Sequence, residues 1–290
     1  MKNLKIFRNS RAIVTGHTGF KGSWLTAWLK QLGAKVMGIS LDPPTYPSHF
    51  GASKINLGIK DVRLDIRDKV KLEQKITAFK PNFVFHLAAQ SLVGLSYKNP
   101  TITWQTNVLG TLNVLESLRK LKNVCNVVII TSDKCYFNRE IHYGYKETDI
   151  LGGKDPYSGS KASAELLIKS YISSFFLGNK PKIRIATARA GNVIGGGDWA
   201  NNRIIPDCVR SWSKNKKAEL RNPNATRPWQ HVLEAVGGYL CLAINLNFNE
   251  RIHGEPFNFG PNLSREYSVL ELVKATCGHW KNISWKVMPK

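Results

Sequence analysis

Hydrophobic residues over the first forty positions follow a pattern typical of a strand, a helix and a second strand. Residues 11–15 form a short apolar run bounded by glycine, which predicts a buried strand. Residues 23–32 carry apolar side chains at helical spacing, and Gly33 stands where a C-terminal cap is expected. Residues 34–39 predict the next strand. Together these segments predict a β-α-β unit.

The alternation of strands and helices continues to about residue 190. The further strands are expected at 62–65, 82–87, 126–131 and 182–188, and the helices at 69–79, 103–120 and 162–176. Strands separated by helices predict an α/β fold with a doubly wound parallel sheet, the Rossmann type. Beyond residue 190 the pattern loosens. We therefore expect a dinucleotide-binding domain over 1–190 and a smaller, mainly substrate-binding region over 191–290, with some segments returning to the first domain.

Three glycines lie between the first strand and the first helix. The segment reads Gly16-His17-Thr18-Gly19-Phe20-Lys21-Gly22. At such a turn, backbone N–H groups and the positive end of the helix can hold a pyrophosphate. A purely structural turn would also select glycine, but the flanking strand and helix are the context that a dinucleotide site requires. We predict that these seven residues bind a dinucleotide.

The choice between NAD and NADP depends on the end of the second strand. A carboxylate is expected there to bind the ribose hydroxyls, and Asp42 is the candidate. No arginine follows before Arg63, so nothing close in the sequence would hold a 2′-phosphate. NAD is therefore the predicted cofactor.

Small and polar residues follow four of the expected strands. These are Asp65, the segment Ala88-Ala89-Gln90, the segment 132–134 and the segment 190–192. Doubly wound sheets bind their ligands beyond the carboxyl ends of the strands. We therefore expect all four segments to lie on one binding rim.

Tyr157 and Lys161 are four residues apart at the start of a predicted helix, so they share one face. A phenol is a poor base at neutral pH, but a nearby ammonium and a nicotinamide cation favour the phenolate. The pair could then take a hydroxyl proton while hydride leaves for the cofactor. A Tyr-x-x-x-Lys spacing also occurs by chance in helices. Downstream of the glycine-rich unit, it predicts a nicotinamide oxidoreductase.

Ser132, Asp133 and Lys134 place an acid and an amine side by side after an apolar strand. Their simplest explanation is a strand-end cap with a surface ion pair. A plain reductase needs only one hydroxyl proton carrier, however, and this second pair permits an elimination. Once C4 of a hexose is a ketone, the C5 proton is acidic. Lys134 suits the base role if burial or Lys161 depresses its pKa, and Asp133 suits the acid that protonates the departing C6 hydroxyl.

The composition is that of an ordinary globular chain, with 42% hydrophobic residues in 290. The chain contains no run of about 18 apolar residues, so we expect no membrane span, and we expect no signal peptide. The net charge of +22 comes from lysines spread along the chain, which favours a basic solvated surface over nucleic-acid binding. The cysteines are scattered without a C-x-x-C pair, which favours reduced thiols in a cytoplasmic protein and no metal site. The five are Cys125, Cys135, Cys208, Cys241 and Cys277.

Four segments carry long motifs. They are 16–24 (Gly-His-Thr-Gly-Phe-Lys-Gly-Ser-Trp), 131–136 (Thr-Ser-Asp-Lys-Cys-Tyr), 189–199 (Arg-Ala-Gly-Asn-Val-Ile-Gly-Gly-Gly-Asp-Trp) and 227–234 (Arg-Pro-Trp-Gln-His-Val-Leu-Glu). In these motifs, and over essentially the whole chain, the protein resembles the CDP-glucose 4,6-dehydratase family of extended short-chain dehydrogenases/reductases. The motifs after residue 189 are far more specific than the Tyr-x-x-x-Lys spacing.

The resemblance implies an NAD-dependent internal redox cycle on a nucleotide-sugar. Tyr157 and NAD would oxidise C4 of the glucose in CDP-glucose. Asp133 and Lys134 would eliminate water across C5 and C6, and hydride would return to C6. The product would be CDP-4-keto-6-deoxyglucose, a precursor of deoxysugars in surface polysaccharide.

The resemblance also implies individual contacts. Asp65 and Ile66 would flank the adenine, Ala88 and Ala89 the dinucleotide, and Asn192, Arg203 and Arg227 the nucleotide-sugar, with the Arg227 guanidinium suited to a diphosphate. Further cofactor candidates are Leu87, Gln90, Asn107 and Thr131, and further substrate candidates are Gln90, Ser91 and Arg221.

Two departures from relatives are apparent. Lys134 stands where related dTDP-glucose dehydratases carry an acidic residue. The chain ends at Lys290, whereas the family continues through a further segment, so we expect an incomplete substrate region. A homodimer or higher homo-oligomer is expected from the same resemblance.

Three other functions are compatible with these residues. A UDP-N-acetylglucosamine 4,6-dehydratase or a 4-epimerase would share the fold, although an epimerase would not need Asp133 and Lys134. A truncated, catalytically inactive NAD-binding homologue would keep only the cofactor site.

Overall fold

Seven parallel strands form the main sheet of the computed structural model, which describes residues 3–141, 144–178, 181–261, 267–280 and 283–288. The strands are β1 (Arg11–Thr15), β2 (Lys35–Ser40), β3 (Lys60–Arg63), β4 (Phe83–His86), β5 (Cys125–Ile130), β6 (Ile183–Ala190) and β10 (Pro256–Phe259). Their order is β10-β6-β5-β4-β1-β2-β3. From β1 to β3 the strands are added toward one edge of the sheet, and from β4 onward they are added toward the other edge, so the strand order reverses between β1 and β4. Ligands bind beside such a reversal, at the carboxyl ends of the strands.

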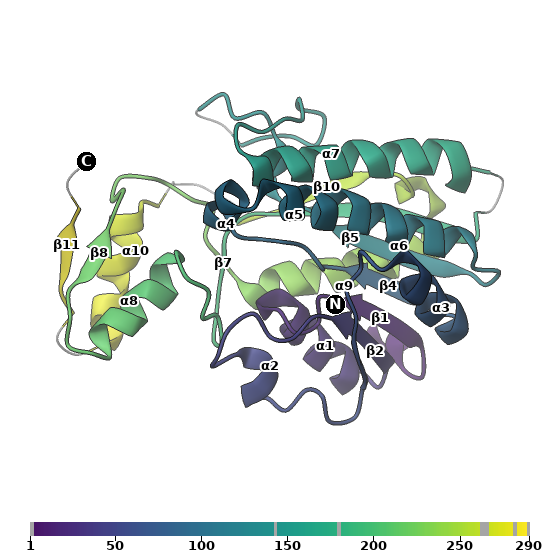
Figure 1. Cartoon of the computed structure of the whole chain (residues 1–290), viewed down its shortest axis with the longest axis horizontal. Helices are drawn as coiled ribbons and strands as arrows, with labels where there is room; N and C mark the ends of the chain where they lie inside the picture. The colour runs from purple at the N-terminus through teal and green to yellow at the C-terminus, as the bar shows by residue number, and fades with distance from the viewer. Residues whose placement is uncertain (1–2, 142–143, 179–180, 262–266, 281–282, 289–290) are drawn as a thin grey trace.

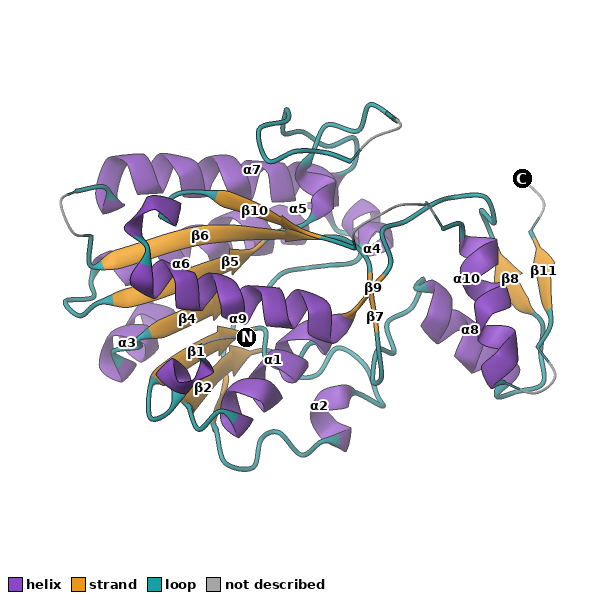
Figure 2. Ribbon diagram, turned by 180° about the vertical axis from the view of Figure 1, so that it is seen from behind, coloured by secondary structure: helices purple, strands orange, loops and turns teal. Residues whose placement is uncertain are grey.

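Helices cover both faces of this sheet (Figures 1 and 2). One layer contains α3 (Lys69–Phe79), α5 (Pro100–Trp104), η2 (Gln105–Leu109), α6 (Gly110–Arg119), α7 (Pro156–Tyr171) and η4 (Ile172–Phe176), and the other contains α1 (Phe20–Gln31) and α9 (Val232–Phe248). Each layer has its own apolar core. Leu72, Leu115 and Ile168 pack on one face of the sheet, and Leu25 and Leu240 on the other. Burial on both faces explains why the strands are near-continuous apolar runs.

A smaller lobe stands beside the carboxyl edge of the sheet (Figure 1). It consists of α8 (Ile204–Trp212), α10 (Val269–Ala275) and the parallel pair β8 (Ala218–Leu220) and β11 (Trp285–Val287), with Trp212 and Val273 in its core. The short pair β7 (Val193–Ile194) and β9 (Gln230–His231) connects the lobe to the sheet. Shorter elements are α2 (His49–Ala52) and α4 (Val93–Lys98) and the 3-10 turns η1 (Leu4–Phe7), η3 (Asp133–Cys135), η5 (Glu250–Ile252) and η6 (Thr276–His279).

The expected fold class is confirmed, and the early elements lie close to their predicted bounds. β1 covers 11–15 and α3 covers 69–79, as the pattern predicts, and Gly33 follows α1 with φ +80°. Two helices begin earlier than expected. α1 starts at Phe20, so Lys21 and Gly22 are helical, and α7 starts at Pro156 because Asp155 caps it by accepting from the Ser158 N–H at 3.0 Å.

The segment after residue 190 contributes more to the main body than its loosened pattern indicates. The 17-residue helix α9 packs on β5 and β6, and β10 pairs with β6. The residue pattern after position 190 does not predict α9. Its uniformly apolar composition gives no amphipathic signal, because a helix buried on most sides lacks a polar face.

The cysteine side chains described by the structure, Cys125, Cys135, Cys208 and Cys241, are free thiols, as their spacing predicts. The side chain of Cys277 and the chain end at residues 289–290 lie outside the described part. Within the described ranges, we find no helix with both the length and the apolar character needed to cross a membrane.

Candidate active site

The glycine-rich turn joins β1 to α1 in a conformation that only glycine allows at two positions. Gly16 has φ +75°, in the left-handed region, and a Cβ there would lie 2.7 Å from the Ala88 backbone nitrogen. A Cβ on Gly22 would lie 2.1 Å from the Gly16 carbonyl oxygen. The start of α1 therefore approaches the turn backbone closely, which leaves a side-chain-free cradle. This geometry fits a dinucleotide pyrophosphate.

We expect Gly22→Ala to weaken NAD binding by about 10- to 100-fold, because overpacking of this size costs about 1–3 kcal/mol. The added methyl group meets backbone atoms, which cannot rotate away. Titration calorimetry with NAD measures the effect. Gly144→Ala is the matched control, since Gly144 is exposed and a Cβ there meets nothing within 4 Å. Equal affinities of the two variants would contradict a cradle at Gly22.

A chain of hydrogen bonds fixes the start of the segment after β4. The His86 Nδ1 lies 2.7 Å from the Thr15 hydroxyl, which accepts from the Ala88 N–H at 3.2 Å. His86 Nε2 lies 3.1 Å from the hydroxyl of Thr111, which donates to the Asn107 carbonyl at 2.7 Å. These roles assign the neutral Nε2–H tautomer to His86. Burial agrees, since it lowers the pKa of His86 to about 3, with the Lys161 charge acting in the same direction.

This histidine makes the folded chain sensitive to acid. The unfolded imidazole takes a proton near its ordinary pKa of about 6.5, whereas the folded one does not, so its contribution to stability is complete above about pH 6.5 and falls as the pH falls below that value. We expect the free energy of unfolding to drop by about 2 kcal/mol between pH 6.5 and 5 from this group. Urea unfolding across this range measures it, and His86→Gln should flatten the dependence. An unchanged slope in that variant would contradict the assignment.

Asp42 lies at the end of β2, where its side chain is 90% exposed. The structure also brings Arg63 there from the neighbouring strand. An arginine that is distant from Asp42 in the sequence is therefore close to it in the fold. The guanidinium is already occupied, however. Arg63 lies 3.4 Å from Asp42 and 2.9 Å from Asp61, and it donates to the Leu41 carbonyl at 3.1 Å. Two carboxylates that neutralise Arg63 disfavour a 2′-phosphate, so the preference for NAD has a different physical basis from the one the sequence indicated.

The segments after β3 and β4 lie at the same carboxyl edge of the sheet as the glycine-rich turn. Asp65 pairs with Arg67 at 2.6 Å, and Ile66 is buried against Gly110. Gln90 is held firmly: its N–H donates to the Asn107 amide oxygen at 2.8 Å, and its carbonyl accepts from the Asn107 amide at 3.0 Å. Asn107 thus orients the chain at Gln90 from a buried position. Leu87, Ala88, Ala89 and Ser91 complete this segment.

Tyr157 and Lys161 lie on the inner face of α7, and both are 7% exposed. Burial lowers the pKa of Lys161 to about 8, against the opposing charge of Glu165. Burial also raises the pKa of Tyr157 to about 12, while the nearby Ser132 side chain acts in the opposite direction. Among the chain's own groups the phenol is therefore favoured, contrary to the expectation from the Lys161 charge. Lys161 Nζ is directed to the Ile130 carbonyl, 3.4 Å away.

Ser132, Asp133 and Lys134 follow β5 and open the short turn η3. The buried Ser132 hydroxyl donates to Asp133 Oδ1 at 2.9 Å and accepts from the Lys134 N–H at 3.2 Å. Ser132 also lies close enough to Tyr157 to act on the pKa of its phenol. The structure therefore brings the two sequence motifs together: one serine binds the aspartate of the second pair and lies near the tyrosine of the redox pair.

Two groups add charge and polarity to this site. Burial lowers the pKa of Lys21 to about 8, with Arg203 acting in the same direction and Asp133 against it. Lys21 donates to the Tyr239 hydroxyl at 3.5 Å, and Tyr239 is fully buried on α9. Burial raises the pKa of Tyr239, and the charges of Tyr157 and Asp133 act in the same direction. Tyr239 is not among the residues predicted from the sequence, because the apolar pattern does not predict α9; a single tyrosine in an apolar helix is the available signal.

The predicted substrate residues divide between two places. Arg203 is close enough for its charge to affect Tyr157 and Lys21, and it pairs at 2.8 Å with Asp198, whose side chain is 6% exposed. Asn192 lies where the chain leaves β6, and its carbonyl accepts from the Gln230 N–H at 3.1 Å. Arg221 and Arg227 are exposed, the first directly after β8 of the smaller lobe. Their contacts with substrate remain predictions.

Sequence comparison places the chain among known enzymes. Residues 13–288 match the GDP-mannose 4,6 dehydratase family. The CDP-glucose 4,6-dehydratase of Salmonella typhimurium is 48% identical over 98% of this chain and 80% of its own length.

Solved structures share the same architecture. An epimerase of Methanothermobacter thermautotrophicus superposes with a TM-score of 0.83 at 24% identity, covering 100% of this chain and 83% of its own. The dTDP-glucose 4,6-dehydratase of Streptomyces venezuelae, solved with NAD bound, gives a TM-score of 0.78 at 23% identity, covering 96% and 85%. At these identities the likeness establishes the fold.

Proposed function

Because the chain belongs to the GDP-mannose 4,6 dehydratase family, we propose that it is an NAD-dependent nucleotide-sugar 4,6-dehydratase that converts CDP-glucose to CDP-4-keto-6-deoxyglucose. The observation that carries this proposal is the connection through Ser132. It places Asp133, an acid that a simple oxidoreductase does not need, beside Tyr157. The 48% identity to a CDP-glucose enzyme supports the choice of nucleotide and sugar.

The first half of the reaction uses α7. When bound, NAD supplies the hydride acceptor for C4 and a positive charge that favours the Tyr157 phenolate. Tyr157 takes the proton of the C4 hydroxyl. Lys161, one helical turn further along the same buried face, adds positive charge behind the tyrosine.

The second half uses the segment after β5. A C4 ketone acidifies the C5 hydrogen, and we assign its removal to Lys134. Asp133 donates a proton to the C6 hydroxyl, which leaves as water. Ser132 holds one Asp133 oxygen, so the carboxyl group has a fixed orientation next to Tyr157. Return of the hydride to C6 and of a solvent proton to C5 leaves a net loss of one water molecule.

Positive charge at the rim suits an anionic substrate. The guanidinium of Arg203 and the ammonium of Lys21 face the same region, and the net charge of the chain is +22. A nucleoside diphosphate would gain from paired N–H donors of an arginine fork. We assign the diphosphate to Arg203, with Arg227 and Arg221 as further candidates from the smaller lobe.

The test is incubation with CDP-glucose and NAD in deuterated water. We expect a 4-keto-6-deoxy product that carries deuterium at C5. UDP-N-acetylglucosamine, UDP-glucose and dTDP-glucose serve as competitors for the sugar nucleotide. CDP-galactose as the only product would show an epimerase and contradict the proposal, and so would a complete lack of turnover with tight NAD binding.

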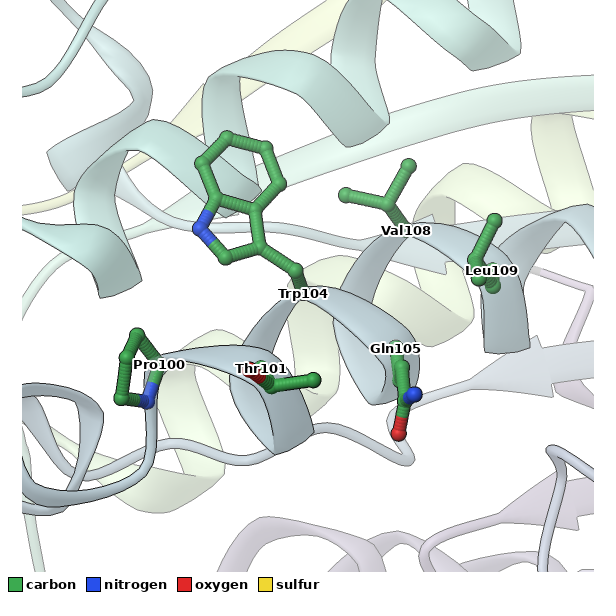
Figure 3. Close-up of a pocket in the computed structure, with 6 residues that line it drawn as sticks. All are labelled: Pro100, Thr101, Trp104, Gln105, Val108 and Leu109. Atoms are coloured by element: carbon green, nitrogen blue, oxygen red, sulfur yellow. The ribbon is translucent and has the colours of Figure 1, made fainter.

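We also propose that the chain acts in the cytoplasm as a homodimer, formed through the outer face of α5, η2 and α7. Apolar side chains are exposed along both helical stretches. They are Ile102, Trp104 and Leu109 on α5 and η2, and Leu166 and Phe175 on α7 and η4. Figure 3 shows Trp104, Val108 and Leu109 among the residues of this stretch that line a pocket. Exposed apolar side chains gathered on one layer of helices are typical of subunit interfaces. Sedimentation equilibrium should give twice the 32.6 kDa chain mass, and a monomer would contradict the proposal.

A further inference from the structure

Glu165 lies on the same face of α7 as Tyr157 and Lys161, at the next spacing of four residues. It is only 5% exposed, so its carboxylate sits behind the site rather than in it. A buried carboxylate is costly unless other groups in the fold satisfy it. The partners of Glu165 therefore show what the fold gains from keeping it.

Four donors saturate the two carboxylate oxygens. Arg189 donates from Nε to Oε1 at 3.0 Å and from Nη2 to Oε2 at 2.9 Å, as a bidentate pair. The Thr187 hydroxyl donates to Oε2 at 3.1 Å, and the Thr131 hydroxyl donates to Oε1. All three partners are buried. Thr131 follows β5 directly, and Thr187 lies within β6, so the carboxylate joins α7 to these two adjacent strands.

The arginine extends this network to a second point. Arg189 Nη1 donates to the Tyr136 hydroxyl at 2.8 Å and to the Glu147 carbonyl at 3.0 Å. The Tyr136 hydroxyl in turn donates to Asn258 Oδ1 at 2.7 Å, on β10. Thr131 and Tyr136 immediately flank Ser132, Asp133, Lys134 and Cys135. The Glu165–Arg189 pair therefore holds the segment of the second acid and amine at both ends.

We propose that Glu165 is a positioning residue that fixes the segment 132–135 against α7, so that Asp133 and Lys134 keep their place relative to Tyr157. The helix that carries the redox pair thus also sets the location of the elimination pair. An error of about 1 Å in a reacting group can cost about a hundredfold in rate. The proposal rests on the proposed function for its catalytic consequence, but not for its structural one.

Two threonines provide a matched test. Thr131→Val and Thr187→Val each remove one hydroxyl from the same carboxylate at nearly constant volume, but only Thr131 adjoins the segment 132–135. We expect amide hydrogen exchange over residues 132–136 to accelerate about tenfold in Thr131→Val and to stay near wild type in Thr187→Val. Exchange needs no substrate, so it remains decisive even if the wild-type protein fails to dehydrate CDP-glucose.

The catalytic readout follows the same comparison. Thr131→Val should lower the rate of product formation from CDP-glucose about tenfold with little change in KM, while Thr187→Val changes it less than about twofold. Glu165→Gln should lower it about a hundredfold and, where folded, show the same exchange pattern as Thr131→Val. Equal exchange and equal rates in the two threonine variants would overturn the proposal and leave Glu165 as a purely structural partner of Arg189. NAD affinity measured for each variant separates these effects from cofactor loss.

Discussion

Tyr157→Phe should lower the formation of the keto-deoxy product by about 10²–10⁴-fold, the usual contribution of a positioned proton carrier. The phenol is buried, close to Ser132 and one turn from Lys161 on α7. Phenylalanine fills the same volume, so the fold should remain. Because the first oxidation fails, no reduced nicotinamide should accumulate after CDP-glucose is added, as followed by its near-ultraviolet absorbance.

Tyr97→Phe is the matched control for this variant. Tyr97 is 66% exposed on α4, and loss of its hydroxyl should leave turnover unchanged. Reduced nicotinamide formed at the wild-type rate in Tyr157→Phe would show that another group takes the C4 proton. The buried hydroxyl of Tyr239 would then be the next candidate, because its pKa responds to the charges of Tyr157 and Asp133.

Asp133→Asn should separate the two halves of the reaction. The amide keeps the size of the carboxyl group but does not donate the proton that the C6 hydroxyl needs in order to leave. We expect product formation to fall by about 10²–10⁴-fold while reduced nicotinamide still forms in a single turnover. Rapid-mixing absorbance and quenched product analysis measure the two steps on one sample.

The outcome of Asp133→Asn depends on the division of roles between the motifs. If oxidation and water loss fell by the same factor, Asp133 would act on the first step or on substrate binding instead. A normal rate of water loss would assign the acid role to another group. Lys134→Met offers an independent check, since it should block C5 exchange with solvent while the C4 oxidation continues.

Local patterns were sufficient to predict the first part of the fold. The strand 11–15 and the helix 69–79 were predicted from apolar periodicity and glycine placement, because these elements have short-range signals and fixed caps. The glycine turn was predicted for the same reason. Its φ at Gly16 and the close approach at Gly22 are constraints that a single residue type satisfies.

Other parts of the site depend on contacts between distant segments. Arg63 reaches Asp42 because β3 pairs with β2, although the two residues are 21 positions apart. The pKa of Tyr157 is raised because the surrounding protein excludes water, an effect that the Tyr-x-x-x-Lys spacing does not contain. α9 brings Tyr239 to the site from a segment whose uniform apolar pattern does not predict which side of a helix faces the sheet.

The sequence by itself determined the class of fold, the dinucleotide turn and the two reactive motifs, because each depends on residues that are close together along the chain. Only the tertiary structure decided how the motifs act on one another. Ser132 binds Asp133 and lies near Tyr157, and the Glu165–Arg189 pair, from α7 and β6, holds that segment at both ends. Hydrogen bonds, burial and the resulting pKa values depend on which groups meet in space, and that is fixed by the packing of the parallel sheet against its helices.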